Sequence, residues 1–262
     1  MKPGLYIVGT PIGNLDDTTA RALETLRNVD FILAEDTRHT RILLDRFSIK
    51  KYLVSCHRFS ECSRIQLVLD KIRAGQAAAL VTNAGMPGIA DPGARLVSAC
   101  RQNGVYLTVI PGPSSVTSAV ALSGFGGDGF ICEGFLPRKK GARRRRLAEL
   151  KSMNGPIVIL ESPYRCLQFL EELNDIFLDR EIFMGRELTK LNEECLWGTA
   201  AEIRSFFLGK PGGAPPRAVR GELTFVIAGA SKKERRDAGN PDEEIDSSAE
   251  NGDLSQAGPD EK

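Results

Sequence analysis

Three short apolar segments in the first half of the chain each end in a loop rich in glycine and proline. The first segment, Leu5–Val8, runs directly into the loop Gly9–Asn14, and similar loops at Thr82–Gly93 and Pro111–Ser115 follow two later segments. Glycine lets a ligand approach the main chain with no side chain in the way, and proline fixes the path of the loop. Because loops that follow parallel strands lie at one edge of a sheet, we expect these three to form one site.

Apolar segments alternate with helical patterns along this part of the chain, which predicts an α/β fold with largely parallel strands. One predicted helix is amphipathic, because its apolar residues are spaced i, i+3, i+4 and i+7. These residues are Ile65, Val68, Leu69 and Ile72. The predicted strands of this first unit are Leu5–Val8, Phe31–Ala34, Leu53–Cys56, Ala77–Val81 and Val105–Ile110.

A second α/β unit is predicted after the glycine-rich connection Gly124–Gly129. Its predicted strands are Gly129–Glu133, Ile157–Leu160, Ile182–Gly185 and Leu223–Ala228. Helices are predicted at Arg143–Lys151, Arg165–Phe177 and Thr199–Leu208. We therefore expect two α/β domains, residues 1–115 and residues 116–230, since 262 residues suffice for two hydrophobic cores.

Charge is unevenly distributed along the chain. The segment Asp237–Lys262 contains nine acidic residues and one basic residue, whereas residues 1–236 contain 34 basic and 25 acidic residues. The apolar pattern stops after Gly229, so we predict that residues 231–262 form a disordered acidic tail. The basic remainder is typical of proteins with a polyanionic partner, although a solvated surface explains it equally well.

Several classes of protein are disfavoured by what the sequence lacks. No apolar run reaches the roughly 18 residues of a membrane helix, and the first residues do not have the pattern of a signal peptide. We therefore expect a cytoplasmic protein with reduced thiols. Six cysteines without a CxxC pair, and only the histidines His39 and His57, make a metal site unexpected. The Walker A, GxGxxG and GxSxG motifs are absent, which disfavours ATP, dinucleotide and serine-hydrolase chemistry.

Seven motifs follow one another in the order and spacing of a known family. They are GTPIGN at Gly9–Asn14, AEDTR at Ala34–Arg38, NAGMPGIADPG at Asn83–Gly93, PGPSS at Pro111–Ser115, EGFLPRK at Glu133–Lys139, ESPYR at Glu161–Arg165 and RELTK at Arg186–Lys190. Over about residues 4–229, the chain resembles the ribosomal RNA small subunit methyltransferase I family of the tetrapyrrole methylase superfamily. Seven motifs in one order are far more than chance would produce.

The resemblance implies a fold, a cofactor and a reaction. The fold is two α/β domains of the tetrapyrrole-methylase type (class III methyltransferases), with S-adenosylmethionine in the cleft between them, in a homodimer. Family members methylate the ribose 2′-hydroxyl of a cytidine in the decoding region of small-subunit ribosomal RNA. This RNA, or the small ribosomal subunit, is therefore the implied partner. The implied cofactor-binding residues are Gly9, Pro11, Gly13, Gly85, Met86, Pro87, Pro111, Gly112 and Ser115.

The second loop departs from the usual family pattern, SDAGTP. Here Asn83 stands in place of the acid, and Met86 stands in place of the hydroxyl residue. Asparagine keeps hydrogen-bonding capacity without the charge, and the thioether of Met86 has the character to pack on the adenine. Every glycine and proline of the motif is kept, so we expect the cofactor to bind and the enzyme to be active.

Transfer to a ribose hydroxyl requires that the hydroxyl be held in line with the methyl donor, and it benefits from a nearby base or cation. The candidate groups are Glu35, Asp36, Glu187 and Lys190. Each also fits a helix cap or a surface ion pair, and the sequence does not choose between these roles. Asp91 likewise fits either a ligand site or an N-cap, with Pro92 as the first residue of the following helix.

The segment Arg138–Arg146 carries seven positive charges in nine residues. RNA phosphates are the natural counter-charge for such a run, so we predict RNA contact here rather than a solvated basic face. The predicted RNA-binding residues are Arg138, Lys139, Lys140, Arg143, Arg144, Arg145 and Arg146.

Two other functions stay open at this point. One is a tetrapyrrole-type C-methyltransferase of the same superfamily, which the basic run and the motifs GFLPRK and RELTK disfavour. The other is a ribosome-binding protein that has lost catalysis through the altered second loop.

Overall fold

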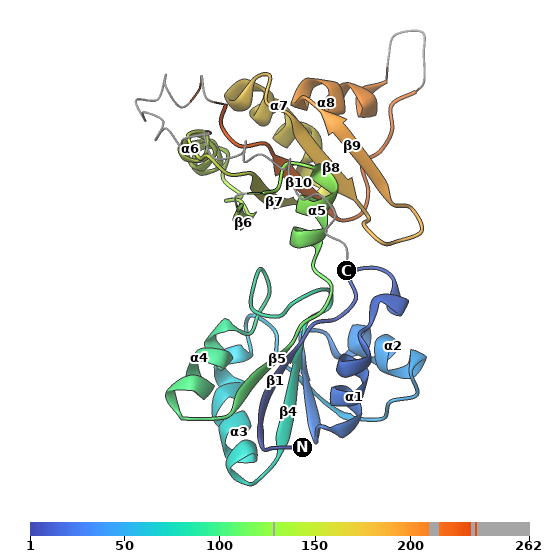
Figure 1. Cartoon of the computed structure of the whole chain (residues 1–262), viewed down its shortest axis with the longest axis vertical. Helices are drawn as coiled ribbons and strands as arrows, with labels where there is room; N and C mark the ends of the chain where they lie inside the picture. The colour runs from blue at the N-terminus through green and yellow to red at the C-terminus, as the bar shows by residue number, and fades with distance from the viewer. Residues whose placement is uncertain (128, 210–214, 232–233, 235–262) are drawn as a thin grey trace, which may run out of the picture.

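The computed structural model describes residues 1–127, 129–209, 215–231 and 234. Within them lie two five-stranded sheets, each flanked by helices, which form the lower and the upper part of the molecule in Figure 1. The predicted disordered tail, residues 231–262, lies outside the described residues except for Ser231 and Glu234. None of the described helices is both long enough and apolar enough to span a membrane.

The first sheet is wholly parallel, with the strand order β3-β2-β4-β1-β5. Its strands are β1 (Gly4–Val8), β2 (Phe31–Ala34), β3 (Tyr52–Ser55), β4 (Ala77–Val81) and β5 (Leu107–Ile110). Helices α1 (Ala20–Asn28) and α2 (Thr37–Arg46) cover one face, and α3 (Glu61–Arg73) and α4 (Ala94–Gln102) cover the other. All five residues of β4 are buried, as expected for a central parallel strand covered on both faces.

The order of these strands brings the three glycine and proline loops together. Strand β1 lies between β4 and β5 and runs parallel to both, so the loops that follow the three strands leave the sheet at the same edge. In Figure 1 this edge faces the upper part of the molecule. The predicted convergence of the three loops is therefore confirmed.

The second sheet is mixed, with the order β6-β7-β10-β8-β9. Its strands are β6 (Ile131–Phe135), β7 (Ile157–Glu161), β8 (Ile182–Arg186), β9 (Glu194–Gly198) and β10 (Leu223–Ile227). Only β6 and β7 are parallel, and the other neighbours are antiparallel. The sequence did not predict β9, because this edge strand is half-buried and lacks a continuous apolar run.

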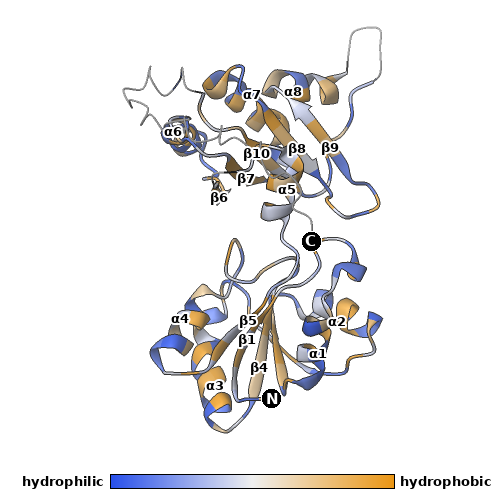
Figure 2. Ribbon diagram, in the orientation of Figure 1, coloured by the Kyte–Doolittle hydropathy of each residue, from blue (hydrophilic) through white to orange (hydrophobic). Residues whose placement is uncertain are grey.

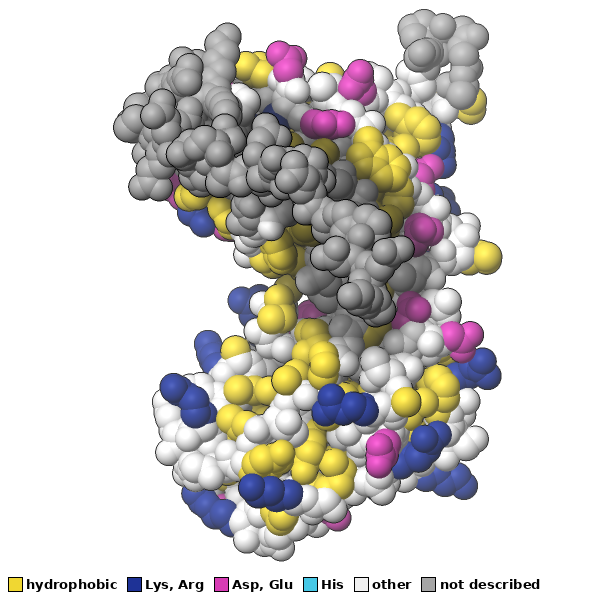
Figure 3. All heavy atoms as spheres, viewed as in Figure 1, with side chains coloured by type: hydrophobic (Ala, Val, Ile, Leu, Met, Phe, Trp, Pro, Cys, Tyr) yellow, Lys and Arg dark blue, Asp and Glu magenta, His cyan; other side chains and the backbone are white. Residues whose placement is uncertain are grey.

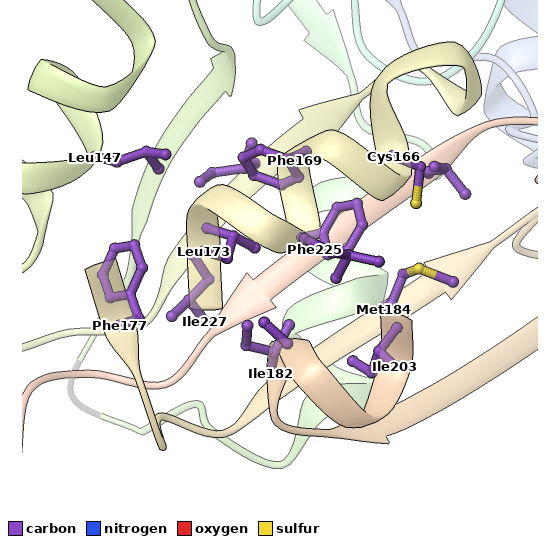
Figure 4. Close-up of a cluster of buried hydrophobic side chains, with 14 of the residues drawn as sticks. Leu147, Cys166, Phe169, Leu173, Phe177, Ile182, Met184, Ile203, Phe225 and Ile227 are labelled. Atoms are coloured by element: carbon purple, nitrogen blue, oxygen red, sulfur yellow. The ribbon is translucent and has the colours of Figure 1, made fainter. Parts of the chain in front are cut away.

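Helix α5 (Ser115–Ser123) covers one face of the second sheet, whereas α6 (Lys140–Leu150), α7 (Cys166–Phe177) and α8 (Ala200–Leu208) cover the other. Figure 4 shows the larger core, in which Phe169 of α7 packs edge-on against Phe225 of β10 with ring centroids 5.1 Å apart. Figure 2 shows largely hydrophobic strands and helices that carry both hydrophobic and hydrophilic residues. The predicted strands and helices agree with the observed ones to within three residues at their ends.

The first loop links the two sheets. Ile12 is buried with Val116 of α5 and with Phe183 of the second sheet. The main-chain N–H of Asn14 donates a hydrogen bond to Oγ1 of Thr189, at 3.1 Å. The edge of the first sheet and the second sheet therefore share one packed interface.

The thiols differ sharply in exposure, which predicts their reactivity. Burial raises the pKa of Cys166 to about 12, and it raises the pKa values of Cys56 and Cys100 to about 11. Cys62 and Cys132 are exposed. We expect an aromatic disulfide reagent at pH 8 to label Cys62 rapidly, and Cys132 more slowly because burial raises the pKa of its thiol. The three buried thiols should be labelled only after denaturation, because the thiolate is the reactive form. Peptide mapping after a short pulse checks this, and rapid labelling of Cys166 would contradict it.

Candidate active site

The three loops and the second sheet together line a cavity of about 370 Å³, here called the main cavity. The first loop contributes Ile12, the second contributes Gly85 and Met86, and the third contributes Ser114 and Ser115. From the second sheet and its connections come Phe135, Leu160, Glu161, Ser162, Pro163, Gly185, Leu188, Gly221, Glu222, Leu223 and Thr224. The main cavity therefore lies between the two sheets, as the resemblance implied for the cofactor.

The loops are packed main chain against main chain. A Cβ atom added to Gly9 would lie 2.6 Å from Sδ of Met86 and 2.7 Å from Cα of Gly112, and one added to Gly112 would lie 2.9 Å from main-chain atoms of Gly9. The first and second loops exchange two hydrogen bonds, Thr10 N–H to Gly85 O at 2.9 Å and Gly85 N–H to Thr10 O at 3.1 Å. Gly9 and Gly112 thus permit a contact that shapes the main cavity.

The predicted cofactor residues fall into separate groups. Gly85, Met86 and Ser115 line the main cavity. Pro11 and Gly13 line a neighbouring space of about 290 Å³, here called the side cavity. The remaining four residues line neither of these two cavities: Gly9, Pro87, Pro111 and Gly112.

Asp91 lines the main cavity and is not the N-cap of the following helix, so the structure excludes one of its two predicted roles. Helix α4 begins at Ala94, and its N-cap is Gly93, so Asp91 lies two residues before the cap. The φ of Gly93 is 134°, a value that glycine adopts readily. Burial raises the pKa of Asp91, and the nearby carboxylate of Glu35 raises it further. The structure thus places the carboxyl group of Asp91 at the main cavity.

Two of the candidate catalytic acids are engaged in the scaffold. Glu35 accepts hydrogen bonds from Oγ1 of Thr82 at 2.7 Å and from the main-chain N–H of Asn83 at 3.2 Å, so it fixes the start of the second loop. Asp36 is the N-cap of α2, accepting from the N–H of Arg38 at 2.9 Å. Hydrogen bonds from Arg38 hold the pKa of Asp36 well below its usual range. The capping alternative is therefore the one that the structure supports for Asp36.

The other two candidates, Glu187 and Lys190, meet beside the first loop. Nζ of Lys190 lies 3.0 Å from a carboxylate oxygen of Glu187 and 3.0 Å from one of Glu222, and Lys190 lines the side cavity. Burial alone would lower the pKa of Lys190, but the two hydrogen-bonded carboxylates outweigh it and raise the pKa above its ordinary value. Burial alone would raise the pKa of Glu187. The hydrogen bonds from the main-chain N–H of Glu222 and from the Lys190 side chain outweigh burial and lower this pKa. Lys190 is thus a protonated cation at neutral pH.

The fold pairs three of the seven cations of the basic run with carboxylates. Arg143, predicted to bind RNA, is 2% exposed, and its Nε and Nη2 lie 2.7 Å from the two carboxylate oxygens of Glu172. This prediction is wrong for Arg143, because its guanidinium is enclosed between α6 and α7. Arg144 pairs with Asp175 at 2.8 Å, and Arg146 pairs with Glu133 and Glu149.

Four cations of the run remain at the surface. Within the part of the chain that the structure describes, they are exposed and form no ion pair: Arg138, Lys139, Lys140 and Arg145. The RNA-binding prediction therefore depends on these four side chains and not on all seven.

Sequence reasoning missed the contribution of the second sheet to the main cavity. The motif ESPYR follows β7, so the rule used for the first sheet could have pointed to Leu160–Pro163. Gly221–Thr224 gave no such signal, because β10 is antiparallel to β7 and begins at the edge where β7 ends. Among the described residues, no group of three or more His, Cys, Asp or Glu side chains is arranged to hold a metal ion.

Comparison with known proteins agrees with this geometry. The sequence profile of the Tetrapyrrole (Corrin/Porphyrin) Methylases matches residues 4–204. The Ribosomal RNA small subunit methyltransferase I of Thermotoga maritima is 49% identical over 225 residues, which are 86% of this chain and 98% of that protein. The chain belongs to the ribosomal RNA small subunit methyltransferase I family of tetrapyrrole methylases. The family member from Synechocystis sp. is 41% identical, over 88% of this chain and 81% of that protein.

Several solved structures share the fold. A uroporphyrin-III C-methyltransferase from Thermus thermophilus superposes with a TM-score of 0.59 at 18% identity, covering 91% of this chain and 98% of that one. The Thermus thermophilus enzyme complexed with S-adenosylhomocysteine superposes with a TM-score of 0.56 at 18% identity, covering 86% of this chain and 97% of that one. Diphthine synthase superposes with a TM-score of 0.62 at 13% identity, covering 89% of this chain and 92% of that one. The expected family and fold are therefore confirmed.

Proposed function

We propose that this protein transfers the methyl group of S-adenosylmethionine to the ribose 2′-hydroxyl of a cytidine in the decoding region of small-subunit ribosomal RNA. The observation that carries the proposal is the main cavity, which forms where the glycine and proline motifs of the family meet. Relatives that are 37–49% identical over most of the chain bear the name of ribosomal RNA methyltransferases. The ribose hydroxyl and the cytidine come from the family resemblance.

The residues of the main cavity fit S-adenosylmethionine. Its volume of about 370 Å³ falls in the range of small-molecule sites. Apolar side chains such as Ile12, Met86 and Leu188 suit an adenine ring, and the carboxyl groups of Asp91 and Glu222 suit a ligand with positive charge. No lysine or arginine is among the described residues that line this cavity. When bound, the cofactor supplies a methyl carbon that is already electrophilic because it is attached to a sulfonium.

The side cavity is the place that we assign to the acceptor nucleotide. It shares Ile12, Ala84 and Glu222 with the main cavity, so ligands in the two would be neighbours. Oδ1 of Asn83 is buried at this cavity and has no hydrogen-bond partner within the described residues, which leaves it for a donor on a ligand. Lys190, protonated at neutral pH, is suited to stabilise the negative charge that develops on a ribose oxygen, and unsuited to act as the base.

We expect Lys190→Gln to lower kcat about tenfold, because one charge-assisted hydrogen bond contributes about 1.5 kcal/mol. The affinity for S-adenosylmethionine, measured by calorimetry, should stay unchanged. Lys139→Gln is the matched control. Lys139 is exposed at the N-cap of α6, so its substitution should raise KM for RNA and leave kcat unaltered. An unchanged kcat in Lys190→Gln would remove the lysine from the mechanism.

The decisive experiment is methyl transfer from labelled S-adenosylmethionine to small ribosomal subunits that lack the modification, followed by nuclease mapping. We expect the label in a 2′-O-methylcytidine of the decoding region. Transfer to a tetrapyrrole offered in a parallel assay, without transfer to the subunits, would favour the C-methyltransferase alternative. Binding to the subunit without any transfer would favour a ribosome-binding protein that has lost catalysis.

The proposal also covers the domain boundaries, the oligomeric state and the cellular location. We propose domain boundaries near residues 115 and 230, since α5 already packs on the second sheet, and limited proteolysis tests them. The homodimer follows the family resemblance, and sedimentation equilibrium tests it. A cytoplasmic location, tested by fractionation, suits a ribosomal RNA substrate.

A further inference from the structure

Two exposed aromatic side chains stand where β6 and β7 end. Phe135 is the last residue of β6 and is 60% exposed, and Tyr164 follows β7 and is 97% exposed. The two strands are parallel neighbours, with Phe135 paired to Leu160, so both aromatic residues lie at the same edge of the second sheet. Phe135 and Pro163, the residue before Tyr164, line the main cavity. The aromatic pair therefore borders the mouth of that cavity.

The turn that presents Tyr164 is firmly built. Glu161 is 2% exposed, and its carboxylate accepts hydrogen bonds from the main-chain N–H of Ser162 and from Nε of Arg165, the latter at 2.9 Å. The N–H of Arg165 donates to the carbonyl of Ser162 at 3.0 Å and closes the 3₁₀ turn Pro163–Arg165. The anchored turn thus holds an almost fully exposed aromatic ring whose faces are free to contact a ligand.

Positive charge follows Phe135 closely along the chain. Arg138, Lys139 and Lys140 begin three residues after Phe135 and are exposed, without an ion pair among the described residues. Figure 3 shows hydrophobic side chains on both sides of the waist between the two parts of the molecule, with basic side chains close by. Exposed aromatic rings next to unpaired cations are the combination that binds unpaired RNA, with bases on the rings and phosphates on the cations. A protein partner would not require the cations.

We propose that Phe135 and Tyr164 are a stacking platform for unpaired bases of the RNA next to the acceptor nucleotide, with Arg138 and Lys139 on the flanking phosphates. This inference rests on the proposed function and deepens it, because it specifies RNA that is single-stranded at the site of methylation. It also gives Tyr164, Arg138 and Lys139 of the motifs ESPYR and EGFLPRK a role, since these three residues do not line the main cavity. Stacking is tolerant of sequence, so the platform selects open RNA rather than a particular base.

Tyr164→Ala tests the platform, with Tyr164→Trp and Tyr52→Ala as matched variants. Tyr52 is also an exposed tyrosine, 66% accessible, but it begins β3 and so lies at the opposite edge of the first sheet from the loops. The probe is a fluorescein-labelled hairpin RNA with the decoding-region sequence, read by anisotropy at constant salt. We expect about tenfold weaker binding for Tyr164→Ala, and wild-type binding for Tyr164→Trp and Tyr52→Ala.

Two further measurements separate this inference from its alternatives. The hairpin closed by a complementary strand should bind wild type and Tyr164→Ala alike, because paired bases do not reach the rings. The affinity for S-adenosylmethionine, from calorimetry, should be the same in Tyr164→Ala and wild type. Wild-type RNA affinity in Tyr164→Ala overturns the platform. So does a change from dimer to monomer in sedimentation with RNA affinity per subunit intact, which would make this face a contact between two copies.

The platform and the proposed function fail in distinguishable ways. The anisotropy measurement needs no methyl transfer, so a wild-type protein that transfers no label but binds RNA through Tyr164 would refute only the function. A protein that methylates RNA with Tyr164→Ala at wild-type affinity would refute only the platform. Phe135→Leu, which keeps an apolar side chain at the cavity but removes the ring, should weaken RNA binding in the same direction as Tyr164→Ala.

Discussion

Arg143→Gln is expected to lower the free energy of unfolding by about 3–5 kcal/mol, because it leaves a buried carboxylate without its partner. The guanidinium of Arg143 meets both carboxylate oxygens of Glu172 at 2.7 Å, and its Nη1 donates to the carbonyl of Arg138 at 3.1 Å. Both side chains of the pair are 2% exposed, so water does not replace the lost bonds. Urea denaturation followed by circular dichroism measures the loss.

Arg145→Gln is the matched control for this prediction. Arg145 lies two residues further along α6 and is exposed, so its substitution should change stability by no more than about 0.5 kcal/mol. It should instead weaken RNA binding and lower the slope of the salt dependence by about one. The double variant Arg143→Met with Glu172→Leu should recover most of the stability, because it removes both buried charges together. A stable Arg143→Gln protein with weakened RNA binding would restore Arg143 to the RNA-binding face.

Gly112→Ala is expected to lower kcat/KM for methyl transfer by about 100-fold, because displacement of a binding loop by about 1 Å has an effect of this size. The added Cβ atom would lie 2.9 Å from three main-chain atoms of Gly9, and neither loop has a flexible side chain there that could yield. The first and third loops must therefore separate, which alters the wall of the main cavity. Calorimetric titration with S-adenosylmethionine should show a parallel loss of affinity.

Gly141→Ala is the matched control, because it adds the same methyl group at a position without neighbouring atoms. A Cβ atom on Gly141 has no neighbour within 4 Å, and the residue lies inside helix α6, where alanine is favoured over glycine. This variant should keep full cofactor affinity and unfold at a slightly higher temperature. Wild-type affinity in Gly112→Ala, with an unchanged circular dichroism spectrum, would show that the contact between the loops does not shape the site.

The site could be predicted where one rule of parallel sheets applies. Apolar strands followed by glycine and proline loops indicated β1, β4 and β5, and the order of the strands does bring their loops together. The same rule would have found Leu160–Pro163 after β7. It could not find Gly221–Thr224, because the direction of β10 in the sheet depends on tertiary pairing that no local pattern records.

Charges were harder to interpret than loops. A run of seven basic residues does not reveal that Glu172, 29 positions further on, will enclose Arg143. The partner is visible only after α6 and α7 pack, and the same holds for Asp175 opposite Arg144. The role of Asp91 stayed open for a more local reason, because the sequence does not show that Gly93, and not Asp91, is the N-cap of α4.

Ile12, Ala84 and Glu222 line both cavities and so form a common wall between them. A ligand that pushes this wall from one side changes the shape offered on the other. Thermodynamic linkage then requires reciprocity: the factor by which the cofactor alters affinity for RNA equals the factor by which RNA alters affinity for the cofactor. The residues shared by the two cavities therefore couple binding of the methyl donor to binding of the acceptor before any bond is exchanged.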